Sequence, residues 1–186
     1  MKIIGISGSI VGSKTRVAVE LALQYIQNKQ KDIDIELIDL SDYNLVFCDG
    51  RDYHDYSGDT KIVLEKILSA DAFIIGTPTF QASIPGTLKN LFDLLPRDAF
   101  CEKAISILVT AGTPKHFLVA EQQLKPILDY MQAVVIPKYV FIEGKHFDQK
   151  VIVDEGILKR IDRLTQDTIN WAKALEEMKN PIASTL

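Results

Sequence analysis

The chain has 186 residues, of which 47% are hydrophobic, and its net charge is −4. This length suggests one domain with a sizeable core, and scattered basic residues in an acidic chain argue against a protein that binds nucleic acid by charge. No apolar run is as long as a membrane span and no signal-peptide pattern precedes the first strand, so we expect a cytoplasmic protein without a membrane partner. Cys48 and Cys101 share no Cys-x-x-Cys spacing and the histidines form no ligand pattern, so no metal site is expected.

Residues 2–16 combine an apolar strand with a polar loop that opens a helix. The run from Lys2 to Ser7 is short and rich in isoleucine, which predicts a buried strand. The loop from Gly8 to Thr15 contains two glycines, three hydroxyl side chains and Lys14, and apolar residues then recur at helical spacing. Free N–H groups, the helix dipole and the hydroxyls would converge on one point. This pattern favours a phosphate-binding loop over an ordinary helix cap.

Residues 8–15 also approach the nucleotide-triphosphate pattern Gly-x-x-x-x-Gly-Lys-Ser/Thr, except that Ser13 stands where the second glycine belongs. A P-loop-like nucleotide-binding protein is therefore an alternative. It would need an acidic residue at the end of an apolar strand to hold magnesium, and residues 72–78 and 104–110 end without one. The dinucleotide pattern Gly-x-Gly-x-x-Gly is absent, and the hydrolase pattern Gly-x-Ser-x-Gly fails at Ser9.

The remaining chain alternates predicted strands and helices. Apolar and acidic residues alternate in the second strand, which is typical of a sheet edge. A polar loop, residues 41–59, follows it and is longer than an ordinary connection. The predicted strands cover residues 33–40, 72–76, 104–109 and 133–142, and the predicted helices cover residues 61–70, 85–95, 116–131 and 156–179.

Two prolines lie in the interior of these predicted elements. Pro126 has no N–H to donate to the carbonyl of Gln122, so a kink or bulge is expected in the helix 116–131. Pro137 is tolerated in the fifth strand only near an edge or a bulge.

Five strands that are each followed by a helix predict an α/β fold with a parallel sheet covered on both faces. The edge character of the second strand favours the strand order 2-1-3-4-5, in one domain over residues 1–180 with a disordered tail at 181–186. In such a sheet the ligand binds beyond the carboxyl ends of the strands, at the switch point between strands 1 and 3. The loops 8–15, 77–84 and 110–115 should therefore converge.

The segment 76–96 reads Gly-Thr-Pro-Thr-Phe-Gln-Ala-Ser-Ile-Pro-Gly-Thr-Leu-Lys-Asn-Leu-Phe-Asp-Leu-Leu-Pro and resembles the signature of the NAD(P)H-dependent FMN reductase family. The opening Gly-Ser…Ser-x-Thr and the later Thr-Ala-Gly-Thr-Pro-Lys-His also match in order and spacing. The resemblance covers residues 2–141 and implies a flavodoxin-like three-layer sandwich. Within the family, the chain is most similar to reductases that supply reduced flavin to sulfonate-metabolising monooxygenases. Azo-, quinone- or chromate-reducing flavoenzymes are alternatives, as is a non-catalytic electron carrier of flavodoxin type.

The resemblance implies that FMN carries the chemistry and that NADPH or NADH supplies the hydride, so no catalytic side chain is expected. With a single crevice and no second nucleotide motif, a ping-pong route is predicted. The implied cofactor-binding residues are Ser9, Ser13, Lys14 and Thr15 at the phosphate, Pro78, Thr79, Phe80 and Gln81 beside the isoalloxazine ring, and Thr110, Ala111, Gly112 and Thr113 on its pyrimidine side.

The sequence departs from the family pattern in three places. Val11 stands near the position where many members carry an arginine, and Phe80 stands where many have a tyrosine. Residues 121–123 read Glu-Gln-Gln where some monooxygenase-linked members insert a tyrosine, which weakens the inference of a monooxygenase partner more than the inference of reductase chemistry.

The helices 87–95 and 117–131 carry more apolar residues than one sheet face needs. Such a surplus predicts a homodimer or a homotetramer.

Overall fold

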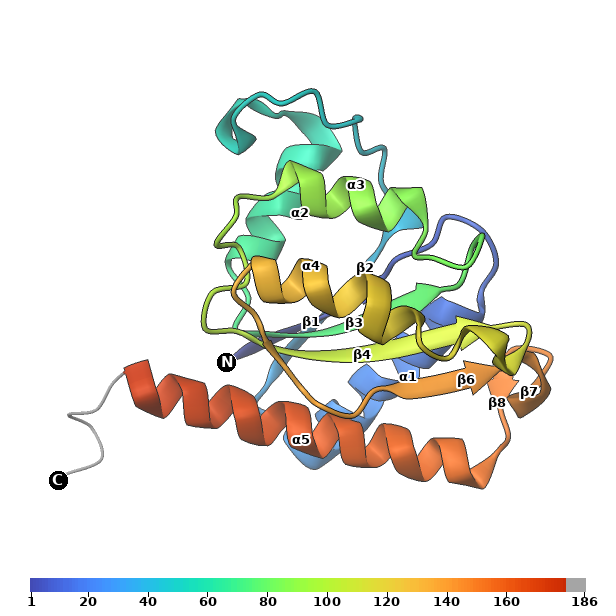
Figure 1. Ribbon diagram of the computed structural model, residues 1–186. Helices are drawn as coiled ribbons and strands as arrows, with labels where there is room; N and C mark the ends of the chain where they lie inside the picture. Colours follow the sequence, from blue (N-terminus) through green and yellow to red (C-terminus); the bar gives the residue numbers. More distant parts are fainter. Residues whose placement is uncertain (180–186) are drawn as a thin grey trace, which may run out of the picture.

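The computed structural model describes residues 1–179 and contains a parallel sheet with helices on both faces (Figure 1). The order is β2-β1-β3-β4-β5, with β6 also paired to β4, so the predicted order is confirmed. The predicted tail, residues 181–186, lies outside the described residues. The strands are β1 (Lys2–Ser7), β2 (Asp34–Asp39), β3 (Ala72–Pro78), β4 (Ala104–Ala111), β5 (Val134–Val135) and β6 (Val140–Glu143).

The helices form two layers that enclose the sheet. Figure 1 shows α2, α3 and α4 on one face, and α1 and α5 on the other. None of the helices within residues 1–179 has the length and hydropathy needed to cross a bilayer. Their bounds are α1 (Lys14–Lys29), α2 (Gly58–Leu68), α3 (Gly86–Leu94), α4 (Lys125–Tyr130) and α5 (Glu155–Lys179).

The central strand β3 separates two hydrophobic cores. Phe73 and Ile75 face the core beneath α2, α3 and α4, whereas Ala72 and Ile74 face the core beneath α1 and α5. Successive side chains of a strand point to opposite faces, so a strand covered on both sides must be apolar throughout. This explains why residues 72–76 of β3 form an uninterrupted apolar run.

Both predicted proline effects are present. The helical segment before α4 forms a π-helical turn, Ala120–Leu124, in which the N–H of Lys125 bonds to the carbonyl of Ala120. The predicted helix 116–131 begins later than expected, because a separate 3₁₀ turn occupies Pro114–His116. Pro137 divides the fifth strand into β5 and β6, which both pair with β4.

The apolar residues of α3 do not form the predicted surplus. Its leucines and Phe92, together with Leu95 beyond its end, are all buried inside the chain, in the core shared with α2 and α4. The inference that this helix offers a free apolar face was therefore wrong. The oligomer itself stays a prediction.

A short hairpin that the sequence did not predict connects β6 to α5. It consists of β7 (Phe147–Asp148) and β8 (Val151–Ile152), which pair in antiparallel fashion. The long loop 41–59 contains two 3₁₀ turns, Leu40–Asp42 and Tyr53–Asp55.

Candidate functional site

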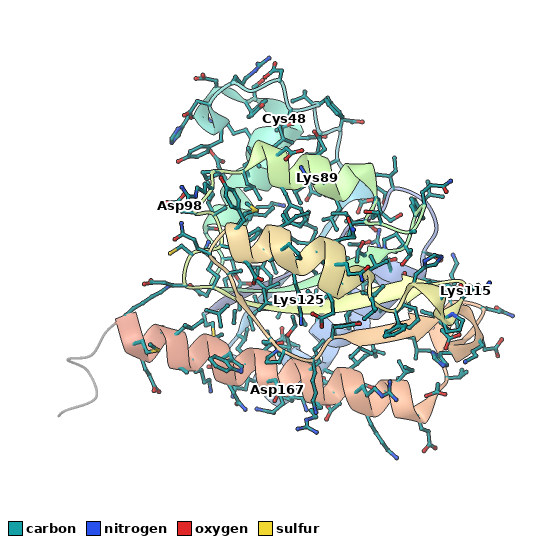
Figure 2. The ribbon with its side chains drawn as sticks, viewed as in Figure 1. Cys48, Lys89, Asp98, Lys115, Lys125 and Asp167 are labelled. Atoms are coloured by element: carbon teal, nitrogen blue, oxygen red, sulfur yellow. The ribbon has the colours of Figure 1, made fainter. Side chains whose placement is uncertain are left out.

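The three predicted loops meet at the carboxyl ends of β1, β3 and β4, where they enclose a cavity of about 420 Å³. Of the predicted cofactor-binding residues, all but Ser9, Gln81 and Thr113 line it, and Val11 and Gly12 line it in addition. Figure 2 shows this end of the sheet near the labelled Lys115. The lining residues are Val11, Gly12, Ser13, Lys14, Thr15, Pro78, Thr79, Phe80, Thr110, Ala111 and Gly112.

The first loop presents the open N-terminus of α1 to this cavity. Gly12 has a φ of +79°, a backbone conformation that favours glycine, and it turns the chain into the helix. Ser13 occupies the N-cap position, but its hydroxyl makes no capping hydrogen bond. The first N–H groups of a helix have no intrahelical partner and the dipole is positive there, so this end attracts an anion.

Lys14 supplies the positive charge of this loop. Its Nζ lies 5.2 Å from the centroid of the Phe147 ring and forms no ion pair with any residue of 1–179. Next to it, Thr15 is buried and its Oγ1 shares a hydrogen bond of 2.7 Å with Oγ1 of Thr110. The start of α1 and the carboxyl end of β4 are therefore linked by these two hydroxyls.

Arg16, the next basic residue, does not line the cavity. Its guanidinium bonds to Glu20 at 2.8 Å, to Asp39 at 3.2 Å and to Asp42 at 3.3 Å. The hydrogen bond to Glu20, together with the charges of all three carboxylates, raises the pKa of Arg16 above its ordinary value. Arg16 is thus held by carboxylates beside β2 and does not replace the arginine that is missing at Val11.

Ser9 stabilises the turn of the loop through hydrogen bonds to the loop backbone. It is 3% exposed, and its hydroxyl donates to the carbonyl of Val11 at 2.8 Å and accepts from the N–H of Val11 at 3.1 Å. Such local side-chain bonds stabilise a turn. Ser9 therefore fixes the path of the loop, while Val11, which is 66% exposed, borders the cavity.

The second loop holds Phe80 in an outward position. Its N–H and carbonyl exchange hydrogen bonds of 2.9 Å with Ser83 across Gln81 and Ala82, whose φ values are +47° and +61°. Positive φ at both central residues is the type I′ arrangement, which is costly for residues other than glycine and is often found at functional sites. Phe80 is 41% exposed, so its ring does not pack into the core and is free to contact a ligand.

Thr79 connects the second loop to the third. Its N–H donates to the carbonyl of Thr110 at 3.0 Å. Its Oγ1 is buried and has no hydrogen-bond partner among residues 1–179. A buried polar atom without a partner costs free energy, so it points to a ligand that completes the site. An anion-binding helix end, a cation, an exposed aromatic ring and this hydroxyl fit a phosphate joined to a flat ring with polar edges.

Comparison with known proteins identifies the family. The model described as "NADPH-dependent FMN reductase" matches residues 1–148. The chain belongs to this family. A Geobacillus thermodenitrificans protein named "NAD(P)H-dependent FAD/FMN reductase" is 42% identical over 177 residues, which cover 95% of this chain and 96% of that protein. A Pseudomonas aeruginosa protein named "FMN reductase (NADPH)" is 29% identical over 160 residues, covering 86% of each chain.

The solved structures agree with the fold of this FMN reductase family member. An apo crystal structure of an NADH:FMN oxidoreductase superposes with a TM-score of 0.76 at 24% identity and covers 93% of this chain and 89% of its own. An archaeal flavodoxin superposes with a TM-score of 0.59 at 16% identity and covers 93% of this chain and 99% of its own. At these identities the likeness establishes a flavodoxin-like fold alone.

Sequence reasoning missed the surroundings of Lys14. The Nζ of Lys14 lies near the Phe147 ring of β7, and a Cβ at Gly144 would lie 3.3 Å from it. Both residues come from the unpredicted segment between β6 and α5. The alternation of Phe147, buried, with Asp148, exposed, was the available signal, but the run is too short to stand out.

Proposed function

We propose that the chain is an NAD(P)H-dependent FMN reductase whose flavin occupies the cavity between the three loops. The observation that carries this proposal is the cavity itself, which is lined by Lys14 at the N-terminus of α1 and by the exposed Phe80. When bound, FMN accepts a hydride from the nicotinamide and passes the electrons to an acceptor. Family membership supports the same reaction.

Each loop has a separate task in this proposal. Ser13, Lys14 and the free amides of α1 hold the phosphate, for which the charge and the helix dipole are suited. Thr79 and the loop 110–112 donate to the polar edge of the ring, and the ring of Phe80 limits the space above its face. The protein thereby orients the flavin and excludes water, and no side chain has to react.

The composition of the cavity supports this function over the P-loop alternative. No acidic residue is among the residues of 1–179 that line it, so magnesium, which prefers carboxylate and phosphate oxygens, has no protein ligand of that kind there. Absorption spectra with and without FMN, followed by NADPH and NADH oxidation assays, test the proposal. Failure to bind FMN at all would contradict it.

The reaction should follow a ping-pong route, because one cavity must receive the nicotinamide and the acceptor in turn. Phe80 and the loop 110–112 border the same opening, which leaves one place beside the ring for both. Initial-rate lines at several acceptor concentrations should be parallel in double-reciprocal plots. Intersecting lines, with a trapped ternary complex, would contradict this route.

We propose that the protein is a homodimer, or a homotetramer of two such dimers, that associates through the exposed Pro126 and Tyr130 of α4, at the groove between α4 and α3. A groove of about 460 Å³ runs there between Phe92 and Ile127, and Tyr130 at its border is 65% exposed. Exposed apolar residues around a groove are typical of an interface. Light scattering at micromolar concentration should give at least twice the chain mass of 20.8 kDa. A monomer mass would contradict the proposal.

We place the enzyme in the cytoplasm because nicotinamide nucleotides, its proposed reductants, are available there. A monooxygenase that accepts flavin is the proposed partner. Support for this partner comes from the resemblance of the sequence to reductases that supply reduced flavin to sulfonate-metabolising monooxygenases. The stretch 121–123, which lacks the tyrosine of some monooxygenase-linked members, lies in the π-helical turn.

A further inference from the structure

A second cavity, of about 740 Å³, adjoins the proposed flavin site and has no role in the function described so far. Ser13 borders both cavities, and the other residues that line the second one come from the β7–β8 hairpin and the residue after it. These residues are Asp148, Gln149, Lys150, Val151 and Val153. None of the loop 78–80 lines it, so it opens from the phosphate side of the flavin cavity.

The hairpin turns one face toward the protein and the other toward this cavity. Phe147 pairs with Ile152, and both are buried in the core beside α1 and α5. Asp148 pairs with Val151, so these two side chains project from the opposite face. Val151 and Val153 are 62% and 53% exposed, which leaves an apolar surface at the cavity, with Lys150 at the turn.

The hairpin is packed against the phosphate loop. The ammonium of Lys14 lies over the Phe147 ring, and the N–H of Val153 donates to the carbonyl of His146 at 2.9 Å, which closes the base of the hairpin. The second cavity therefore begins at a fixed place beside the proposed phosphate site.

We propose that this second cavity binds the adenosine 5′-phosphate half of FAD. The inference rests on the proposed function, because it places the flavin phosphate at Ser13 and Lys14. In FAD a second phosphate is joined directly to the flavin phosphate, so the adenylate must leave the flavin cavity at that point. The cavity that shares Ser13 receives it.

The lining has the chemistry that an adenylate needs. Lys150 is a cation for the second phosphate, and it forms no ion pair within residues 1–179. The carboxylate of Asp148 accepts hydrogen bonds from ribose hydroxyls, a role that acidic residues play in many dinucleotide sites. Val151 and Val153 cover the apolar face of the adenine ring. The reductase would then accept FAD as well as FMN.

The test compares FAD and FMN affinities of Lys150→Gln and Val151→Asp with those of the unchanged protein, by fluorescence or calorimetric titration. Each variant should weaken FAD by about tenfold, or about 1.4 kcal/mol, and leave FMN unchanged. Lys145→Gln is the matched control, because Lys145 is exposed, pairs with Glu143 at 2.8 Å and does not line the cavity. It should change neither affinity.

The outcomes separate this inference from the proposed function. If the unchanged protein binds neither flavin, the proposed function fails. If FMN binds normally but both hairpin variants bind FAD as tightly as the unchanged protein, only the adenylate site is overturned. Variants that raise the KM for NADPH without changing the Kd of FAD would assign the cavity to the nicotinamide nucleotide instead, which also overturns it. Unchanged FMN affinity shows that each variant is folded.

Discussion

Val11→Arg should tighten FMN binding about ten- to a hundred-fold, and Lys14→Ala should weaken it by a similar factor. The side chain of Val11 borders the cavity and is exposed, but it cannot donate a hydrogen bond. A hydrogen bond to a charged group contributes roughly 1.5–3 kcal/mol, which corresponds to that range of affinity. Arginine suits a phosphate because its guanidinium donates two parallel bonds. With valine in this position, FMN is expected to exchange readily, and the protein should purify partly or wholly without colour.

Flavin-fluorescence titration measures both changes. Lys115→Ala is the matched control, since Lys115 is an exposed lysine at the same end of the sheet (Figure 2) but does not line the cavity. It should leave the affinity close to that of the unchanged protein. If Lys115→Ala weakened FMN as much as Lys14→Ala, a general loss of positive charge would account for the effect.

Gly76→Ala should destabilise the fold by roughly 1–3 kcal/mol, the usual cost of overpacking a core. A Cβ at Gly76 would lie 2.4 Å from Cγ2 of Val19 and 3.0 Å from Cγ2 of Thr15, because α1 packs directly on β3 at this point. Thr15 would have to move away from Thr110, with which it shares a hydrogen bond. The substitution should therefore also weaken FMN binding, through the first turn of α1.

Urea unfolding measures the stability effect, as a lower midpoint with an unchanged slope. Gly86→Ala is the control, because a Cβ at Gly86 would meet no atom within 4 Å. In α3 this change should be neutral or stabilising by up to about 1 kcal/mol. Equal midpoints for Gly76→Ala and the unchanged protein would show that β3 and α1 can separate without cost.

The strand order was predictable because the pattern of polar and apolar side chains along a strand shows which of its two faces are buried. Asp34 and Glu36 leave one face of β2 polar, whereas Ala72 to Gly76 is apolar on both faces, and these patterns separate an edge strand from a central one. The effects of Pro126 and Pro137 were predictable for a local reason, the missing N–H. The convergence of three loops then followed from the topology alone.

The rest depends on contacts between segments that are distant in the sequence. Whether the leucines of α3 face a partner or the protein's own core is decided by the packing of α2 and α4, which the helical pattern of α3 does not encode. Ser9 belongs to the phosphate loop by position, yet its hydroxyl is used by the backbone of Val11. The hairpin beside Lys14 has two-residue strands and a turn without glycine or asparagine, so no strong turn signal marks it.

The assignment of residues 8–15 to the phosphate of a flavin can be tested with FMN and riboflavin. FMN and riboflavin differ only in the phosphate, so both are titrated against the unchanged protein and Lys14→Ala at low and high salt. We expect Lys14→Ala to weaken FMN binding, to flatten its salt dependence and to leave riboflavin binding nearly unchanged, because a screened charge is lost at the phosphate alone. Equal effects on FMN and riboflavin, or no effect on either, would contradict the assignment of this loop as the phosphate site.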